Sequence, residues 1–211
     1  MSSAADSSTR AWAPDPEEVK EQLRTAIRTA RAQRSPRLRD EAAIALADVV
    51  ARIPQVLDAS CVSVYASRLG EPGTGVLLEL LASRGVRILL PVLGAGLQRD
   101  WAVYEGPEDL RERAPGRPPE PGGPALGPAA LAEADVIVTP ALAVDTAGSR
   151  LGQGGGWYDR ALEHARADAL VVALVFPEEV YDAQTHPLPH EPHDRRVDAY
   201  ATPAGWVPLT H

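Results

Sequence analysis

The chain has 211 residues, of which 45% are hydrophobic, so it is long enough to bury one core of ordinary domain size. Its net charge of -8 and pI of about 5.1 argue against a broad nucleic-acid surface, because phosphate binding needs clustered positive charge. The lone cysteine, Cys61, excludes an intrachain disulfide. It lies in an apolar, strand-like run, which favours a small buried side chain over a nucleophile.

The ends and the longest apolar run bear on localisation. Residues 169–176 form an apolar run that is too short to span a bilayer. Residues 1–16 lack the apolar segment of a secretory signal. We therefore expect a cytoplasmic monomer with neither a nucleic-acid nor a membrane partner. We expect a disordered leader over 1–14 and a single domain over 15–211.

Two helices are predicted near the N-terminus. In the first, Asp15 supplies the N-cap, Pro16 suits the first turn and Glu18 completes a capping box. An apolar stripe at helical spacing follows, made of Val19, Leu23, Ile27 and Ala30. An adjacent basic stripe consists of Lys20, Arg24, Arg28 and Arg31, and Lys20 is the only lysine among 21 basic residues. The second helix is expected from Ser35 to Ile53.

Strand and helix signals alternate along the rest of the chain. Strands are expected at 61–66, 86–91, 101–104, 134–140, 169–176 and 197–202. Helices are expected at 75–85, 157–167 and 177–182, and a loop rich in proline and glycine at 105–128. Alternating units with continuous apolar strands predict an α/β fold with a parallel sheet covered on both faces.

A glycine-rich loop, "RLGQGGGWYD", follows the strand expected at 134–140. Its clustered glycines allow backbone N–H groups to approach a ligand closely, and a helix start adds free donors, so phosphate is the natural guest. Arg150 could add a bidentate contact, and Asp159 could hold a cation beside phosphates. The loop is not a P-loop, because no Lys-Ser/Thr follows it. It lacks the dinucleotide fingerprint, which needs glycine where Trp157 stands. A flexible surface loop with a tight turn is the alternative.

The segment 140–162, "PALAVDTAGSRLGQGGGWYDRAL", resembles the signature of 5-formyltetrahydrofolate cyclo-ligases, also called methenyltetrahydrofolate synthetases. Other family elements occur in order. They are "KEQLR" with Lys20 and Arg24, "VSVYASRLGEPGT" with Glu71 and Thr74, "GVRILLP", and "PHDRRVDAY" with Asp194 and Asp198.

The resemblance implies a three-layer α/β domain related to sugar-phosphate isomerases and CoA transferases. It also implies an ATP- and Mg²⁺-dependent conversion of 5-formyltetrahydrofolate, in polyglutamylated form, to 5,10-methenyltetrahydrofolate. In this family pattern Lys20 and Arg150 act as catalytic groups, and Asp159 and Asp194 hold Mg²⁺. The nucleotide-binding set would be Lys20, Arg24, Arg150, Leu151, Gly152, Gln153, Gly154, Gly155, Gly156, Trp157 and Tyr158. The folate would be contacted by Glu71, Trp101 and Tyr158.

Each of these residues also has a structural interpretation. Lys20 and Arg24 could form a solvated helix face, Glu71 could cap the next helix, and Trp101 could pack in the core. The chain departs from the family at Gly73, where many members carry an acid. It departs again in "GRPPEP", so that Glu120 receives no role.

Two further alternatives concern metal and function. His186, His190 and His193 with Asp194 suggest a zinc site, but the intervening prolines and the lack of cysteine favour a simple loop. Instead of a cyclo-ligase, the chain could be a related enzyme acting on a sugar phosphate or CoA ester without ATP. It could also be a non-catalytic folate- or nucleotide-binding protein.

Overall fold

The computed structural model describes residues 15–93, 99–114, 116–191 and 194–210, so the expected leader lies outside the described residues. Its main sheet has seven strands in the order β10-β9-β7-β4-β1-β2-β3. Their bounds are β1 Cys61–Ser63, β2 Arg87–Leu93, β3 Arg99–Val103, β4 Val136–Pro140, β7 Leu170–Leu174, β9 Ala199–Thr202 and β10 Gly205–Pro208.

The five central strands are parallel and the two edge strands are antiparallel. β9, β7, β4, β1 and β2 pair in parallel, whereas β3 pairs antiparallel with β2 and β10 with β9. Their side chains form the main core, and the central apolar runs are buried on both faces of the sheet. The predicted α/β class is therefore confirmed, with β10 as an additional strand.

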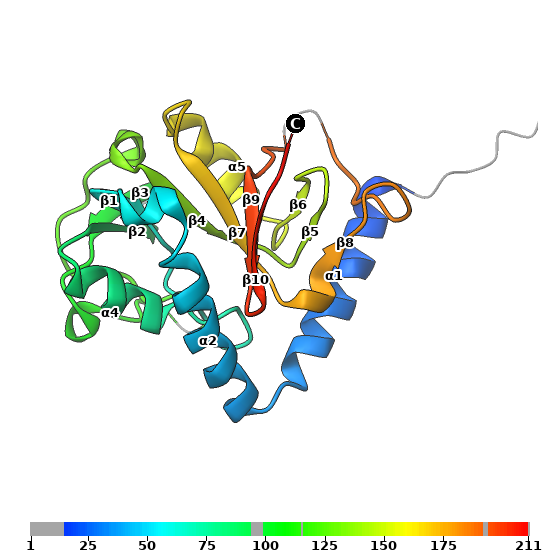
Figure 1. Cartoon of the computed structure of the whole chain (residues 1–211), viewed down its shortest axis with the longest axis horizontal. Helices are drawn as coiled ribbons and strands as arrows, with labels where there is room; N and C mark the ends of the chain where they lie inside the picture. Colours follow the sequence, from blue (N-terminus) through cyan, green and yellow to red (C-terminus); the bar gives the residue numbers. More distant parts are fainter. Residues whose placement is uncertain (1–14, 94–98, 115, 192–193, 211) are drawn as a thin grey trace, which may run out of the picture.

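Helices cover both faces of this sheet. On one face α2 (Pro36–Val50) contacts α4 (Gly75–Ser83), β9 and β10 (Figure 1). On the other, short 3₁₀ turns η3 (Pro128–Glu133) and η4 (Leu162–His164) contact each other next to β3 and α5 (Trp157–Ala161). The remaining short helical segments are α3 Pro54–Leu57, η2 Pro107–Asp109 and η5 Pro177–Glu179. No helix among the described residues is long and apolar enough to cross a membrane.

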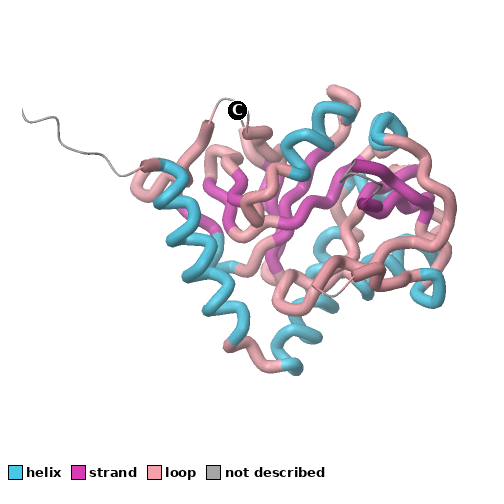
Figure 2. Tube along the Cα trace, turned by 180° about the vertical axis from the view of Figure 1, so that it is seen from behind, coloured by secondary structure: helices cyan, strands magenta, loops and turns pink. Residues whose placement is uncertain are grey.

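The first helix, α1 (Pro16–Ala32), diverges from α2 as one arm of a V (Figures 1 and 2). As predicted, Asp15 caps it, accepting from the Glu17 N–H at 3.0 Å. Glu18, expected in a capping box, instead accepts from the Gln22 amide. The buried face of α1 is largely basic, and consists of Lys20, Arg24, Ile27 and Arg31. Ala30, assigned to an apolar stripe, is exposed.

A second, three-stranded sheet was not predicted. It has the order β6-β5-β8 and consists of β5 Ala143–Asp145, β6 Arg150–Leu151 and β8 Val180–Tyr181. Its side chains Leu142, Ala143 and Leu151 pack with Ile27 of α1 in a small separate core. This sheet lies beside α1 in Figure 1, and it links the first helix to the glycine-rich loop that follows β6.

Three predicted helices differ in extent or type. The segment 177–182 is not a helix, because Val180 and Tyr181 pair with β5 after a single 3₁₀ turn. The helix expected at 157–167 has only five α-helical residues, so its dipole contributes less at the glycine loop than expected. The second helix ends at Val50, and Pro54 begins the separate α3.

Candidate functional site

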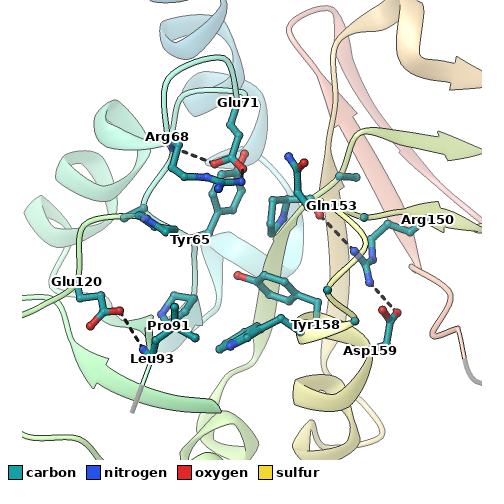
Figure 3. A pocket seen from close by; sticks show the side chains of 18 of the residues that line it. Tyr65, Arg68, Glu71, Pro91, Leu93, Glu120, Arg150, Gln153, Tyr158 and Asp159 are labelled. Atoms are coloured by element: carbon teal, nitrogen blue, oxygen red, sulfur yellow. Dashed lines mark hydrogen bonds and ion pairs between the residues drawn. The ribbon is translucent and has the colours of Figure 1, made fainter. Parts of the chain in front are cut away.

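A pocket of about 210 Å³ lies where three neighbouring parallel strands end. Its walls come from Tyr65 and Ala66 after β1, Pro91 and Leu93 in β2, and Pro140 and Ala141 at the end of β4 (Figure 3). Ligands of parallel α/β sheets bind at the carboxyl ends of the strands, because the connecting loops there converge. The glycine-rich loop and the first turn of α5 close the pocket.

Aromatic side chains give this pocket a flat, apolar surface. The pocket is lined by Tyr65, Trp157 and Tyr158. The rings of Trp157 and Tyr158 pack edge-on, with their centroids 4.8 Å apart. Burial, and next the negative charge of Glu71, raise the pKa of Tyr158 far above its usual value. Its hydroxyl therefore stays protonated. It has no hydrogen-bond partner among the described protein atoms, so it is available to a ligand.

Two carboxylates lie in the pocket wall. Glu71 accepts hydrogen bonds from the Arg68 N–H and from the Arg68 guanidinium, both at 2.9 Å, so it does not cap α4. Glu120 is 3% exposed, and its Oε1 accepts from the Leu93 N–H at 3.0 Å. Its Oε2 lies 3.2 Å from Arg113 Nε but has no partner in hydrogen-bonding geometry among the described residues.

The position of Glu120 is set by the loop at 105–128. Arg111 and Glu120 form an antiparallel bridge with backbone hydrogen bonds of 2.8 and 2.9 Å, which closes the loop on itself, and the Leu93 N–H of β2 donates to the Glu120 side chain. The sequence alone assigns no role to Glu120. The feature that could have indicated one is a single acidic residue between prolines in the loop at 105–128.

The glycine-rich loop is held by α1. Arg24 donates to the Gly152 carbonyl at 3.1 Å, and Arg28 donates to the Gln153 carbonyl at 3.2 Å. Gly154 and Gly156 take positive φ angles of 99° and 56°, which favour glycine. The N–H groups from Gly152 to Gly156 have no acceptor among the described residues, while the carbonyls of Gly152 and Gln153 face arginines.

Basic and acidic residues alternate around this loop. Arg150, whose side chain is 3% exposed, pairs with Asp159 at 2.7 Å. Lys20 pairs with Glu191 at 2.7 Å and with Asp194 at 3.0 Å. Although burial by itself lowers the pKa of Lys20, its bonds to these two carboxylates outweigh burial and raise it. The lysine is therefore a buried, charged ammonium and not a solvated one.

The structure thus brings together most of the residues singled out in the sequence. Besides Lys20 and Arg24, the assembled set contains Arg150, Gly152 to Tyr158, Asp159, Asp194 and Glu71. The backbone N–H of Arg195 lies 3.4 Å from Asp159 Oδ1, which brings the segment next to Asp194 to Asp159. Lys20 and Arg24 are buried, so the solvated-face interpretation is wrong.

Two expected folate or nucleotide contacts fall elsewhere. Trp101 is fully buried and packs edge-on against Trp157 at 5.4 Å, so it is a core residue and not a stacking surface for folate. Leu151 packs in the small core beneath β6. No cluster of three or more His, Cys, Asp or Glu ligands occurs among the described residues, and His193 lies outside them.

The fold and pocket together define an α/β protein with a small-molecule site at the carboxyl edge of a parallel sheet. The model of the 5-formyltetrahydrofolate cyclo-ligase family matches residues 16–203, and the chain belongs to this family.

Individual relatives agree with this assignment. A 5-formyltetrahydrofolate cyclo-ligase of Mycolicibacterium smegmatis is 38% identical over 190 residues, covering 87% of this chain and 93% of that protein. The cyclo-ligase of Escherichia coli is 32% identical over 154 residues, covering 65% and 76%. The NMR structure of Aquifex aeolicus 5,10-methenyltetrahydrofolate synthetase matches with a TM-score of 0.77 and 25% identity, covering 92% of this chain and 94% of that chain.

Proposed function

We propose that this protein converts 5-formyltetrahydrofolate to 5,10-methenyltetrahydrofolate in a reaction that consumes ATP, requires Mg²⁺ and releases ADP and phosphate. Membership of the cyclo-ligase family supports the folate reaction. The observation that carries the ATP requirement is that Arg24 and Arg150 lie at one glycine-rich loop beside an aromatic pocket, with Lys20 one turn before Arg24 on α1.

The charges around the loop suit a nucleotide with a metal ion. Each buried cation is now paired with a carboxylate, as in Arg150 with Asp159 and Lys20 with Asp194. The oxygens of a bound triphosphate would replace these carboxylates as partners of the cations. They would also accept hydrogen bonds from the N–H groups of Gly152 to Gly156, which have no acceptor among the described residues. The Asp159 and Asp194 carboxylates would then contact Mg²⁺ in place of these cations, so that both sets of charges stay compensated.

Asp159 and Asp194 fit the usual protein contribution to a magnesium site. Mg²⁺ prefers oxygen ligands and is commonly held by one or two carboxylates together with phosphates and water. Two aspartates are therefore enough here, although no group of three or more such ligands occurs in the part of the chain that the structure describes. Bound there, Mg²⁺ would neutralise charge that develops on the phosphates.

The pocket suits the flat head of a reduced folate. Its walls are mainly apolar, and the lining includes the rings of Tyr65, Trp157 and Tyr158 and the carboxylates of Glu71 and Glu120. A pterin carries N–H donors along its edge, which carboxylates accept, and Glu120 Oε2 has no hydrogen-bond partner among the described residues. The protonated Tyr158 hydroxyl would donate to a folate oxygen.

The proposed chemistry uses positioning and electrostatics. The formyl oxygen bonds to the γ-phosphorus of ATP as the bond between that phosphorus and the ADP oxygen breaks. Phosphorylation makes the formyl oxygen a leaving group. The folate N10 nitrogen then attacks the same carbon and loses its proton, and phosphate departs with the oxygen. Arg150 and Lys20 would stabilise the charge on the transferring group, which is the main demand of phosphoryl transfer.

The test mixes purified protein with 5-formyltetrahydrofolate, ATP and Mg²⁺ and follows the near-ultraviolet absorbance of the methenyl product. We expect a rise that needs all three additions. Arg150→Ala and Asp159→Ala should each lower turnover by about 10²–10³-fold, the usual effect of removing a transition-state charge contact. Arg52→Ala and Asp168→Ala are matched controls, because both side chains are exposed.

The alternatives make different predictions in the same assay. A related enzyme without ATP chemistry would turn over its substrate when Lys20 is replaced by methionine, and a binding protein would show no absorbance rise while still binding folate. Unchanged turnover in Arg150→Ala or Asp159→Ala would refute the site assignment.

A further inference from the structure

A buried aspartate that the proposed reaction does not use, Asp145, lies between the two segments that carry the proposed magnesium ligands. It ends β5 and is 1% exposed. The turn that it begins, residues 145–149 and here named the Asp145 turn, leads directly into β6 and the glycine-rich loop. Among the described residues the Asp145 carboxylate forms no ion pair, so its contacts are those of an acceptor for backbone N–H groups.

The two oxygens of Asp145 hold two different segments. Oδ1 accepts hydrogen bonds from the N–H groups of Ala147 and Ser149, at 3.0 and 2.8 Å, which fixes the conformation of the turn. Oδ2 accepts from the N–H of Leu188 at 3.1 Å, and Leu188 lies before Asp194 in the chain. Because backbone donors occupy both oxygens, Asp145 is placed to position other groups and not to bind a metal ion itself.

The Asp145 turn also holds the chain that follows Asp194. Arg196 Nη1 donates to the Ala147 carbonyl at 2.7 Å. The Val197 N–H donates to the Gly148 carbonyl at 3.0 Å. Contacts to this one turn therefore fix the chain both before and after Asp194.

These contacts bear on the spacing of the two proposed magnesium ligands. From the turn, the chain in one direction reaches Arg150, which bonds to Asp159 at 2.7 Å. The chain held at the other end of the turn carries Asp194, and the neighbouring Arg195 N–H lies 3.4 Å from Asp159 Oδ1. Groups that orient metal ligands from behind strengthen metal binding, because ligands that are already in place lose little freedom when the ion binds.

We infer that Asp145 is a positioning residue, which fixes Asp194 relative to Asp159 and so preorganises the site for Mg²⁺ and nucleotide. The inference rests on the proposed function for the identity of the metal and the nucleotide. Asparagine at position 145 tests it, because asparagine has nearly the same shape but only one acceptor oxygen. It can accept from the turn or from Leu188, and its amide group then faces the N–H donor on the other side.

The test is a calorimetric titration with a non-hydrolysable ATP analogue, once with Mg²⁺ and once with EDTA, so that no turnover is needed. The wild type should bind the analogue more tightly with Mg²⁺. In Asp145→Asn the ratio of the two Kd values should fall about tenfold, a loss typical of removing a group that orients a metal ligand. The Kd in EDTA should stay nearly unchanged, because the ligands affected are those of the metal.

Arg196→Gln tests the same contact from an exposed position, so the inference stays testable even if Asp145→Asn does not fold. Loss of its hydrogen bond to the Ala147 carbonyl should lower the ratio of the Kd values by about two- to fivefold. Arg84→Gln is the matched control. Arg84 is also an exposed arginine that donates to a backbone carbonyl, that of Ala51 at 2.9 Å, and its replacement should change neither Kd.

Amide exchange at Leu188, measured by NMR without ligand, reports the contact itself. The Leu188 N–H should exchange faster in Asp145→Asn than in the wild type. The positioning role is overturned if exchange at Leu188 is unchanged, if both variants keep the wild-type ratio of Kd values, or if binding weakens equally with Mg²⁺ and with EDTA. A wild type that binds the analogue equally well under both conditions would refute the proposed metal site itself, and this inference with it.

Discussion

The buried pair between Arg31 and Glu179 offers a direct test of how α1 is held against the rest of the protein. Arg31 Nε and Nη2 bond to the two Glu179 oxygens at 2.6 and 2.7 Å, and Nη2 also donates to the Ala141 carbonyl at 2.7 Å. The side chains are only 5% and 4% exposed. Replacing Arg31 with methionine keeps much of the volume but leaves the Glu179 charge buried and unpaired.

Breaking such a pair costs about 3–5 kcal/mol of the free energy of unfolding, since the remaining charge is neither solvated nor compensated. For a protein of this length, 1 kcal/mol corresponds to about 2–4 °C, so Arg31→Met should lower Tm by roughly 6–20 °C. Urea unfolding, followed by circular dichroism and by tryptophan fluorescence, measures the free energy directly.

A second substitution separates the charge effect from lost packing. Glu179 Oε2 also accepts from the Phe176 N–H at 2.8 Å, and glutamine at this position keeps an acceptor there without the charge. Arg31→Met/Glu179→Gln should therefore be more stable than Arg31→Met alone. A cost below about 1 kcal/mol for Arg31→Met, as for a surface pair, or no gain in the double variant, would refute the reasoning. Arg37→Met, at an exposed pair, is the control.

Three other predictions concern single positions. Glu120→Gln should raise the KM for the folate about tenfold, the loss expected for one charged hydrogen bond, and leave the KM for ATP unchanged. Glu108→Gln, at an exposed position on the same loop, is the control, and equal effects on both KM values would contradict the role. Asp135→Asn should cost about 1 kcal/mol at pH 7, because backbone hydrogen bonds from Cys61 and Ser60 hold the Asp135 pKa below its usual 3.8. A carboxyl group whose pKa is lower in the folded than in the unfolded state stabilises the protein above the unfolded pKa. The difference in free energy of unfolding between wild type and variant should therefore shrink as pH falls below 3.8. A difference that grows at such pH would be contrary to this reasoning. Gly73→Ala should lower the free energy of unfolding by about 1–3 kcal/mol, because its new Cβ would lie 2.8 Å from Ala43 Cβ. Adding Ala43→Gly should restore part of this stability in thermal unfolding, and no recovery would point to another cause.

The close packing at Gly73 also explains one departure from the family pattern. Many relatives are expected to carry an acid at this position, and here the backbone approaches Ala43 of α2 so closely that no side chain fits without movement. Glu120, from a different loop, places a carboxylate in the same pocket as Glu71. One of the carboxylates of the pocket thus comes from a loop to which the sequence alone assigns no role.

Features that depend on neighbouring residues could be predicted from the amino-acid sequence. Asp15 and Pro16 began α1, continuous apolar runs gave the central parallel strands, and Gly85 with its positive φ ended α4. The glycine-rich loop was predicted to bind a ligand because clustered glycines permit positive φ angles and close backbone approach, which depends on the residue type alone. Each of these signals acts within one or two turns of chain, so periodicity and capping rules detect it.

The tertiary structure alone decided which polar groups are buried and what they contact. Lys20 and Arg31 of the basic stripe are buried because their acidic partners, Glu179, Glu191 and Asp194, come from the other end of the chain. The strands of the small sheet are only two or three residues long, too short for periodicity to reveal, and exist through their pairing with one another. The burial of Trp101 and the placement of Glu120 follow from contacts between distant segments, which no local pattern encodes because their energy depends on the assembled fold.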